Sequence, residues 1–412
     1  SNVAIGYDTL GELTTVSDNT AVGYAALQAS TSGTGLAAFG KGALRANTTG
    51  NGNTAVGQNA LLANTTGGDN VALGANALDS NTTANDNVAI GRYALQAATT
   101  NADNVAVGSS ALYNNTGHSN TAVGRSSSLA NTSGVRNTSV GMNSLLQNTT
   151  ASDNTALGYA SLQQNTTGSN NTAVGHDALL NNTTAINNTA VGYGTLETNT
   201  TGANNTACGQ AALAACTTGS DNAALGTGAG LANTTGGNNL YLGHDTGRTG
   251  SPGGNNTTGN NAIFLGDENI GDAHIQVDWT VASDQRDKTD FTALDLGLDF
   301  VKALAPVTYK WDKRSKYGDK TAADYDLNAQ TPDGTHKEDW LDIGFKAQEV
   351  EALEIAAGYN KDNKTNLTTT LSDDGNQYGI QYSKFVPILV KAIQEQNALI
   401  EALTTRITTL EG

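Results

Sequence analysis

Apolar and polar positions recur with one short period along the first 248 residues. A glycine preceded by an aliphatic, Cys or Phe residue falls every 17 residues from Gly6 to Gly243, with one interval of 16 between Gly108 and Gly124. The repeat reads Asn-Thr/Val-Ala-Val/Ile/Leu-Gly, then Ala-Leu, then Asn-Thr-Thr-Gly, as residues 53–67 illustrate. A period this strict indicates stacked units, each of which buries its apolar side against its neighbours.

Within each unit the residues before the glycine alternate as they do in a strand. Asn and Ala fall on one side, and Thr/Val and Val/Ile/Leu fall on the other. A leucine follows four residues after most of the glycines, and we expect two units to slip by one residue, to Leu129 and Leu231. Asn-Thr-Thr-Gly then supplies turn chemistry. The sequence predicts a β-solenoid with a thin core of Ala, Val and Leu, and parallel coils would give a shaft of roughly 70 Å.

One such coil is too narrow to bury much surface by itself, so we expect several chains around an axis, and three is the preferred number. Asn-Val-Ala-Ile-Gly, at residues 2–6 and 87–91, resembles the head repeats of YadA-type trimeric bacterial adhesins, which are left-handed β-rolls. Those heads have a shorter period than 17 residues, and we see no adhesin membrane anchor in this sequence.

Composition narrows the classes of function. The chain has 412 residues, a net charge of −17 and only 14% charged residues. The acidic balance argues against nucleic acid as a partner. We find no apolar run long enough for a membrane span and no signal peptide at Ser1. Cys208 and Cys216 are expected to be free thiols, formed in a reducing cytoplasm. The five histidines lack metal-ligand spacing, so we expect no metal and no cofactor.

Three regions follow from this pattern: the repeat shaft (residues 1–248), a junction (249–282) and a C-terminal domain (283–412). The junction begins with turn formers, contains one last coil over residues 261–266, and ends with an alternating stretch over 274–282 that predicts a final strand.

Most Lys and Arg residues and two of the three Trp residues lie beyond the junction, where helix formers become frequent. We expect a small α+β domain with polar excursions over 312–340 and 355–377. Its predicted elements are a helix over 296–304, strands over 307–311 and 378–382, a strand running into a helix over 342–353, and a long helix from Phe385.

The last helix has apolar residues at heptad spacing. These candidate seam positions are Val386, Leu389, Ile393, Gln396, Ile400, Leu403, Ile407 and Leu410. Isoleucine at one position and leucine at the other favours two strands by propensity, although tertiary context can give three. The alternative is a single amphipathic helix that packs on its own domain.

The stretch from Ser283 to Lys288 holds a hydroxyl and an amine five positions apart. Serine is a good nucleophile only when a nearby group takes its proton, and a lysine does so when burial or a neighbouring cation lowers its pKa. Asp284 and Arg286 are possible supporting residues. The alternative is a helix start, with Ser283 or Asp284 as the N-cap and Lys288 as a solvated charge.

Four segments together resemble the self-cleaving intramolecular chaperone at the C-termini of phage tail spikes and fibres, the endosialidase type. They are Ser283-Asp284-x-Arg286-x-Lys288 and the stretches 304–311, 344–350 and 382–396. The resemblance implies a trimeric chaperone that folds the upstream fibre and then cuts itself off. It also implies Ser283 as nucleophile, Lys288 as base and cleavage between Ala282 and Ser283.

The sequence therefore predicts a homotrimeric tail fibre or spike, assembled in the host cytoplasm and carried on the virion tail. Its expected partners are a host surface receptor, either glycan or protein, and other tail or baseplate proteins. The alternative is a bacterial cell-surface adhesin or fibre that carries the same chaperone. A carbohydrate-degrading spike is disfavoured because the repeat has almost no paired carboxylates.

Overall fold

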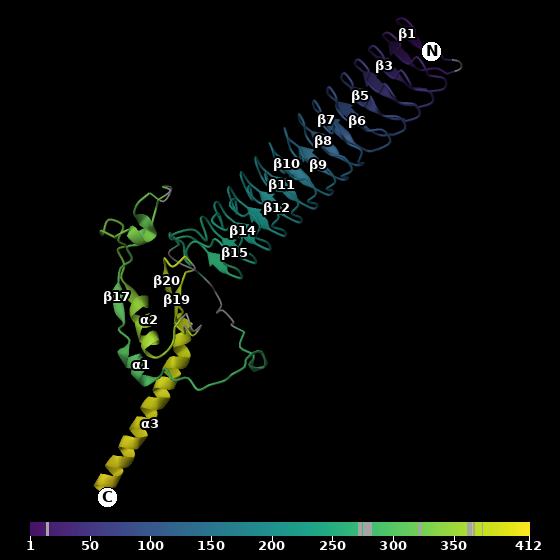
Figure 1. Cartoon of the computed structure of the whole chain (residues 1–412). Helices are drawn as coiled ribbons and strands as arrows, with labels where there is room; N and C mark the ends of the chain where they lie inside the picture. Colours follow the sequence, from purple (N-terminus) through teal and green to yellow (C-terminus); the bar gives the residue numbers. More distant parts are fainter. Residues whose placement is uncertain are drawn as a thin grey trace. The chain divides into compact units, whose positions relative to one another are not determined.

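The computed structural model describes residues 1–13, 16–270, 274, 282–319, 322, 324–360, 365, 367–372 and 374–412. The chain divides into two compact units (Figure 1). One unit, here called the solenoid, comprises Ser1–Arg248 and Asn256–Gly266, and the other, here called the C-terminal unit, comprises Thr249–Asn255 and Asp267–Gly412.

The solenoid is a single sheet of sixteen parallel strands that pair in chain order. Each strand has three residues: β1 (Val3–Ile5), β2 (Thr20–Val22), β3 (Ala37–Phe39), β4 (Thr54–Val56), β5 (Val71–Leu73), β6 (Val88–Ile90), β7 (Val105–Val107), β8 (Thr121–Val123), β9 (Thr138–Val140), β10 (Thr155–Leu157), β11 (Thr172–Val174), β12 (Thr189–Val191), β13 (Thr206–Cys208), β14 (Ala223–Leu225), β15 (Leu240–Leu242) and β16 (Ile263–Leu265). The predicted β-solenoid is confirmed.

The register follows the repeat. Ala55 of β4 pairs with Ala72 of β5, and the same residue of each repeat lies beside its counterpart along the sheet. The short repeat keeps this register, since Ala106 pairs with Ala122. The turn after β15 has extra residues, yet Tyr241 still pairs with Phe264. Length differences are therefore absorbed in the turns, while the three-residue strands stay aligned.

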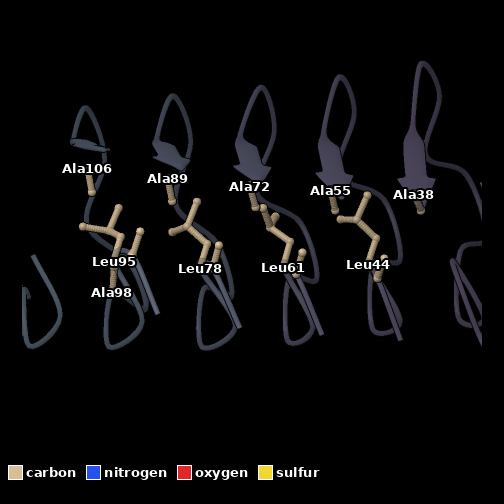
Figure 2. Packing of buried hydrophobic residues seen from close by; sticks show 14 of the residues in the cluster. Ala38, Leu44, Ala55, Leu61, Ala72, Leu78, Ala89, Leu95, Ala98 and Ala106 are labelled. Atoms are coloured by element: carbon tan, nitrogen blue, oxygen red, sulfur yellow. The ribbon is translucent and has the colours of Figure 1, made fainter. Parts of the chain in front are cut away.

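The solenoid core consists mainly of alanine and leucine, and the expectation that strand valines share it is wrong. In Figure 2 the strand alanines, such as Ala89, point toward leucines such as Leu78 from the facing turn. Ala72 and Leu78 have no exposed surface, whereas Leu73 and Ile90 are 41% and 37% exposed. The residue before each repeat glycine therefore points outward and forms a continuous apolar column, here called the outer column.

The core leucines occupy a conformation that leucine rarely adopts. Leu78 has a φ of 51° and Leu95 a φ of 53°, in the left-handed region. That conformation costs roughly 1–2 kcal/mol, and full burial of a leucine side chain offsets it with about 1.5–3 kcal/mol. The slip to Leu129 and Leu231 does not occur. Ser128 (φ 50°) and Gly230 (φ 63°) hold the left-handed core position instead, and the two leucines follow it.

Buried asparagines form ladders along the solenoid axis. The side-chain amide of Asn64 donates to Oδ1 of Asn47 at 2.8 Å, and that of Asn81 donates to Oδ1 of Asn64 at 2.8 Å. The next rung is Ala98, and Oδ1 of Asn81 is left without a hydrogen bond from any described residue. Cys216 interrupts the ladder in the same way above Asn199. Each interruption leaves one buried acceptor unpaired.

An aromatic pair closes the solenoid core at its C-terminal end. The ring of Tyr241 stacks on Phe264 with centroids 5.1 Å apart, and its hydroxyl accepts a hydrogen bond from Asn256 at 2.6 Å. Gly230 and Gly247 lie against this ring, and a Cβ on either would come within 2.7 Å of it. The last coils therefore exchange the alanine–leucine pair for a tyrosine–glycine pair.

The C-terminal unit contains three α-helices and two small antiparallel sheets among its described residues. Its helices are α1 (Leu298–Ala303), α2 (Ala347–Ala356) and α3 (Phe385–Glu411), with short 3-10 turns η1 (Gln285–Asp287), η2 (Arg314–Lys316), η3 (Leu327–Ala329) and η4 (Tyr382–Lys384). One sheet pairs β17 (Val307–Tyr309) with β18 (Asp342–Gly344), and the other pairs β19 (Thr369–Leu371) with β20 (Tyr378–Ile380). These elements confirm the predicted ones; β19 lies in a stretch expected to be an excursion.

The core of this unit is small. It joins Phe300 of α1, Val350 of α2 and Phe385 of α3. Glu395 of α3 accepts a hydrogen bond at 2.7 Å from the backbone N–H of Leu298, at the start of α1. That bond, together with Lys391, lowers the pKa of Glu395. Helix α3 is thus held to its own unit along its first half.

Candidate functional site

The stretch from Ser283 to Lys288 folds into a single 3-10 turn. Asp284 is its N-cap, because the carboxylate accepts a hydrogen bond from the backbone N–H of Arg286 at 2.9 Å. The backbone N–H of Lys288 donates to the carbonyl of Gln285 at 3.2 Å and ends the turn. Asp284 is a residue type that favours capping, which explains why the turn forms at this point.

The turn brings the two predicted reactive side chains together. Nζ of Lys288 lies 2.6 Å from Oγ of Ser283 and 3.5 Å from the carbonyl oxygen of the same residue. This is hydrogen-bonding distance for a nucleophile and its base. The capping turn and the contact between the two side chains coexist, so the two interpretations of this stretch do not exclude each other.

Arg286 pairs with Asp284 and does not contact Lys288. Its Nη2 lies 2.6 Å from Oδ2 of Asp284. This side-chain bond to Arg286 lowers the pKa of Asp284, and the bond to the Arg286 backbone acts in the same direction. In the single chain the pair therefore stabilises the turn that carries Ser283 and Lys288.

The whole turn is exposed, from Ala282 through Lys288. A protonated lysine cannot take a proton from serine, and burial is one of the factors that favours the neutral amine. Of the strand predicted over residues 274–282, only His274 and Ala282 lie among the described residues. A single chain therefore places Ser283 and Lys288 at hydrogen-bonding distance but leaves both side chains exposed to water.

The predicted seam of α3 is exposed in the single chain. The helix buries Phe385, Ile388 and Ala392 on one side. The seam residues lie outside that face, and Ile393 and Ile400 are 56% and 52% exposed. Large apolar side chains at heptad spacing are exposed there, including Val386, Leu389, Leu403, Ile407 and Leu410. The single-helix interpretation therefore accounts for only one of its two apolar faces.

Two sets of hydrogen bonds in this unit are not indicated by any motif or periodic pattern in the sequence. Glu354 of α2 is fully buried, and its carboxylate accepts hydrogen bonds from Thr368 at 2.6 and 2.7 Å and also from Thr369. It ties β19 to α2. The second set joins the segment 249–255 to the loop before β20 through Asp374. Both sets link residues that are far apart in the sequence.

Among the described residues, no group of three or more His, Cys, Asp or Glu side chains is placed to hold a metal ion. In the same part of the chain, no helix combines the length and apolar character needed to cross a membrane.

Residues 283–359 match the family described as the chaperone of endosialidase. This is a peptidase family of self-cleaving intramolecular chaperones. The match begins at Ser283 and spans η1, α1, β17, β18 and α2, while the similar stretch over 382–396 lies beyond it. No curated protein and no solved structure matches the chain significantly. The C-terminal region thus carries a chaperone-of-endosialidase domain, which follows the β-solenoid in the sequence.

Proposed function

We propose that this protein is the shaft of a phage tail fibre or spike, that its C-terminal domain assembles three copies, and that it then cuts the bond between Ala282 and Ser283. The observation that carries the proposal is the 2.6 Å contact between Ser283 and Lys288 at the first residue of the matched family domain. Host attachment, through a glycan or protein receptor, and association with other tail proteins follow from that role.

The cleavage step uses only groups of this chain. Oγ of Ser283 attacks the carbonyl carbon of Ala282 while a neutral Lys288 takes the hydroxyl proton. The C–N bond breaks, and the amine of Ser283 receives that proton, which leaves Ala282 as an ester on Oγ. Water then hydrolyses the ester to give a carboxylate at Ala282 and a free hydroxyl at Ser283. Because attacker and target are neighbours in the chain, proximity supplies a large part of the rate.

Assembly would supply what the single chain lacks at this site. The turn is exposed, and burial is one way to make a lysine neutral. Packing of neighbouring chains over the turn would therefore activate the amine. Cleavage would then follow assembly rather than precede it, and a monomer would remain whole.

Two apolar surfaces support association of several chains. One is the outer column of the solenoid, in which Leu157 and Leu225 are 46% and 54% exposed. The other is the exposed seam of α3, in which Leu403 is 57% exposed. Contiguous exposed apolar surface of this kind marks an interaction site in soluble proteins. Both run lengthwise along their elements, as side-by-side packing of identical chains requires.

The proposal is tested by the intact mass of the purified chain. The wild-type chain should give two fragments that meet at 282/283, whereas Ser283→Ala and Lys288→Met should give one uncut chain. Thr289→Ala removes a neighbouring hydroxyl from the same exposed stretch and should be cut like wild type. Fragments at 282/283 in the Ser283→Ala chain would refute the assignment of the nucleophile.

A further inference from the structure

The proposed cut falls inside a compact unit and not at its edge. The C-terminal unit includes two segments that precede Ser283 in the sequence. One is Thr249–Asn255, and the other runs from Asp267 to the proposed cut. After cleavage these two segments would belong to the fragment 1–282, and the remainder of the unit would belong to the fragment 283–412. The noncovalent contacts between the two parts therefore decide whether the fragments separate.

The first segment is bound by hydrogen bonds across more than a hundred residues. The backbone N–H of Asn255 donates to Oδ2 of Asp374 at 2.8 Å. The side-chain amide of Gln377 donates to the carbonyl oxygen of Gly250 at 3.3 Å. Asp374 also accepts bonds from Ser372 and from the backbone of Asn376. The loop before β20 is thus shaped around the backbone of the upstream segment.

Two glycines allow this close approach. A Cβ on Gly250 would lie 2.7 Å from Cβ of Ser315, and a Cβ on Gly254 would lie 2.7 Å from both Oδ1 of Asp374 and Cβ of Ser372. Real Cβ atoms do not approach side chains so closely, so a larger residue would displace the segment. Ser315 is 3% exposed, which shows that this contact excludes water.

The second segment is bound by two lysines of the C-terminal fragment. Nζ of Lys313 donates to the carbonyl oxygen of Glu268 at 2.7 Å, and Lys316 donates to the side chain of Asn269. None of these contacts depends on the bond between Ala282 and Ser283. We call the full set, from residues 249–255 and 268–269 on one side to 313–316 and 372–377 on the other, the tail clasp.

We propose that the tail clasp holds the C-terminal fragment on the shaft after the chain is cut, so that cleavage and release are separate steps. This inference rests on the proposed cleavage at 282/283. In an assembly of three chains the clasps would act together, and joint contacts hold far more strongly than each one alone. The cut fragment 283–412 is thus a bound partner of the fragment 1–282 until the clasp opens.

Size-exclusion chromatography of the cleaved wild-type protein, followed by denaturing electrophoresis, tests this directly. Both fragments should elute together under native conditions and appear as two bands after denaturation. Gly254→Ala should weaken the clasp and make dissociation about tenfold faster or more, because a bond and a close packing contact are lost together. Cleavage at 282/283 should still occur in that variant.

Gly358→Ala is the matched control, because Gly358 lies in the same unit but outside the tail clasp. Gly358 has a φ of 91° and Gly254 a φ of 74°, so both positions lie in the left-handed region that strains an alanine. A Cβ at Gly358 meets no described atom within 4 Å. Its fragments should stay together. If Gly254→Ala fails to fold, the double variant Asp374→Ala with Gln377→Ala removes the same hydrogen bonds without added bulk.

The possible results separate the two proposals. Wild-type fragments that are cut but elute apart contradict the clasp alone. Clasp variants whose fragments dissociate no faster than those of the wild type also contradict it. A wild-type chain that stays whole contradicts the proposed function, and the clasp inference falls with it.

Discussion

The two units of this chain solve the problem of folding in opposite ways. In the solenoid every coil meets a near copy of itself, so that Ala72 pairs with Ala89 and Asn64 bonds to Asn47. In the C-terminal unit each contact occurs once, such as Glu395 with Leu298 or Glu354 with Thr368. In the solenoid, each coil makes its hydrogen bonds and core contacts with the next coil. In the C-terminal unit, each contact occurs once and so specifies one particular pair of residues.

This difference has a consequence for assembly. If two solenoids pack along their outer columns, a shift by one whole coil places an aliphatic residue against an aliphatic residue again. The repeat therefore specifies the spacing of the contact but not the alignment of the chains. The unit with singular contacts, joined to one end, can set that alignment. A periodic shaft with an aperiodic end is what the proposed division of labour requires.

The largest expected effect comes from breaking the repetition at a glycine. In Gly91→Ala the new Cβ would lie 2.6 Å from backbone atoms of Gly108, at a φ of +133°. Because backbone cannot give way, we expect a loss of about 3 kcal/mol or more in the free energy of unfolding of the solenoid. Thermal unfolding followed by circular dichroism measures it.

Gly35→Ala is the control for that variant. Gly35 has a φ of +67°, and its nearest neighbour atoms would lie 3.9 Å from a new Cβ. Its cost should be limited to backbone strain of about 1–2 kcal/mol. Equal losses in the two variants would show that the close approach between coils is not what the repeat glycine provides.

The next largest expected effect on stability comes from restoring an asparagine where the buried ladder is interrupted. Cys216→Asn restores a rung of the buried ladder and gives the unpaired Oδ1 of Asn199 a donor. Satisfying a buried acceptor contributes roughly 1–3 kcal/mol, so the variant should unfold at a higher temperature than wild type. Ala98→Asn should act in the same direction through Asn81. A lower unfolding temperature in both would contradict the ladder account.

The smallest effect concerns pH and the two thiols. Burial raises the pKa of Cys216 to about 11, whereas Cys208 is exposed in the outer column. Iodoacetamide at pH 8 should therefore leave Cys216 unmodified in the native protein, as a mass measurement would show, whereas Cys208 should react in any chain whose outer column is not covered by assembly. Modification of both thiols without unfolding would contradict the burial of Cys216.

The same shift has a defined effect on stability. The unfolded thiol ionises near pH 8.5–9. The folded state keeps its proton up to about pH 11. Stability is thus unaffected by this group below pH 8.5 and falls as the pH rises from there to about 11.

Much of this fold could be predicted from the sequence because the repeat states it many times over. The strict period gave the strands and the glycine positions, and the alternation within each strand placed Ala72 and Leu73 on opposite sides. It does not say which side faces inward, so a core of Ala, Val and Leu is what it predicts. Alanine occupies the strand side of the interior because leucine from the facing turn fills the space opposite it, and a larger residue, Tyr241, stands there only where glycines face it.

The predicted positions of two leucines within their coils also differ from the observed ones. Leu129 and Leu231 suggested a slip, yet the backbone keeps its turn and places Ser128 and Gly230 at the core position. The regular coil-to-coil hydrogen bonds outweigh the gain from burying one leucine. At the candidate site, Ser283 and Lys288 could be paired from the sequence because they share one turn.

The tail clasp could not be predicted in this way. Residues 249–255 have the composition of a loop, and Gly250 and Gly254 are ordinary in a glycine-rich chain. Their partner Asp374 lies more than a hundred residues away, in a stretch that itself resembled an exposed excursion. Contacts between two irregular segments leave no periodic trace in either of them.

The central claim is that the aperiodic end assembles the periodic shaft. Its most direct test is the mass in solution, by light scattering, of two chains: full-length Ser283→Ala and a chain that ends at Ala282. The first should have the mass of three copies, and the second should be monomeric or insoluble. A soluble trimer formed by the chain that ends at Ala282 would contradict the claim.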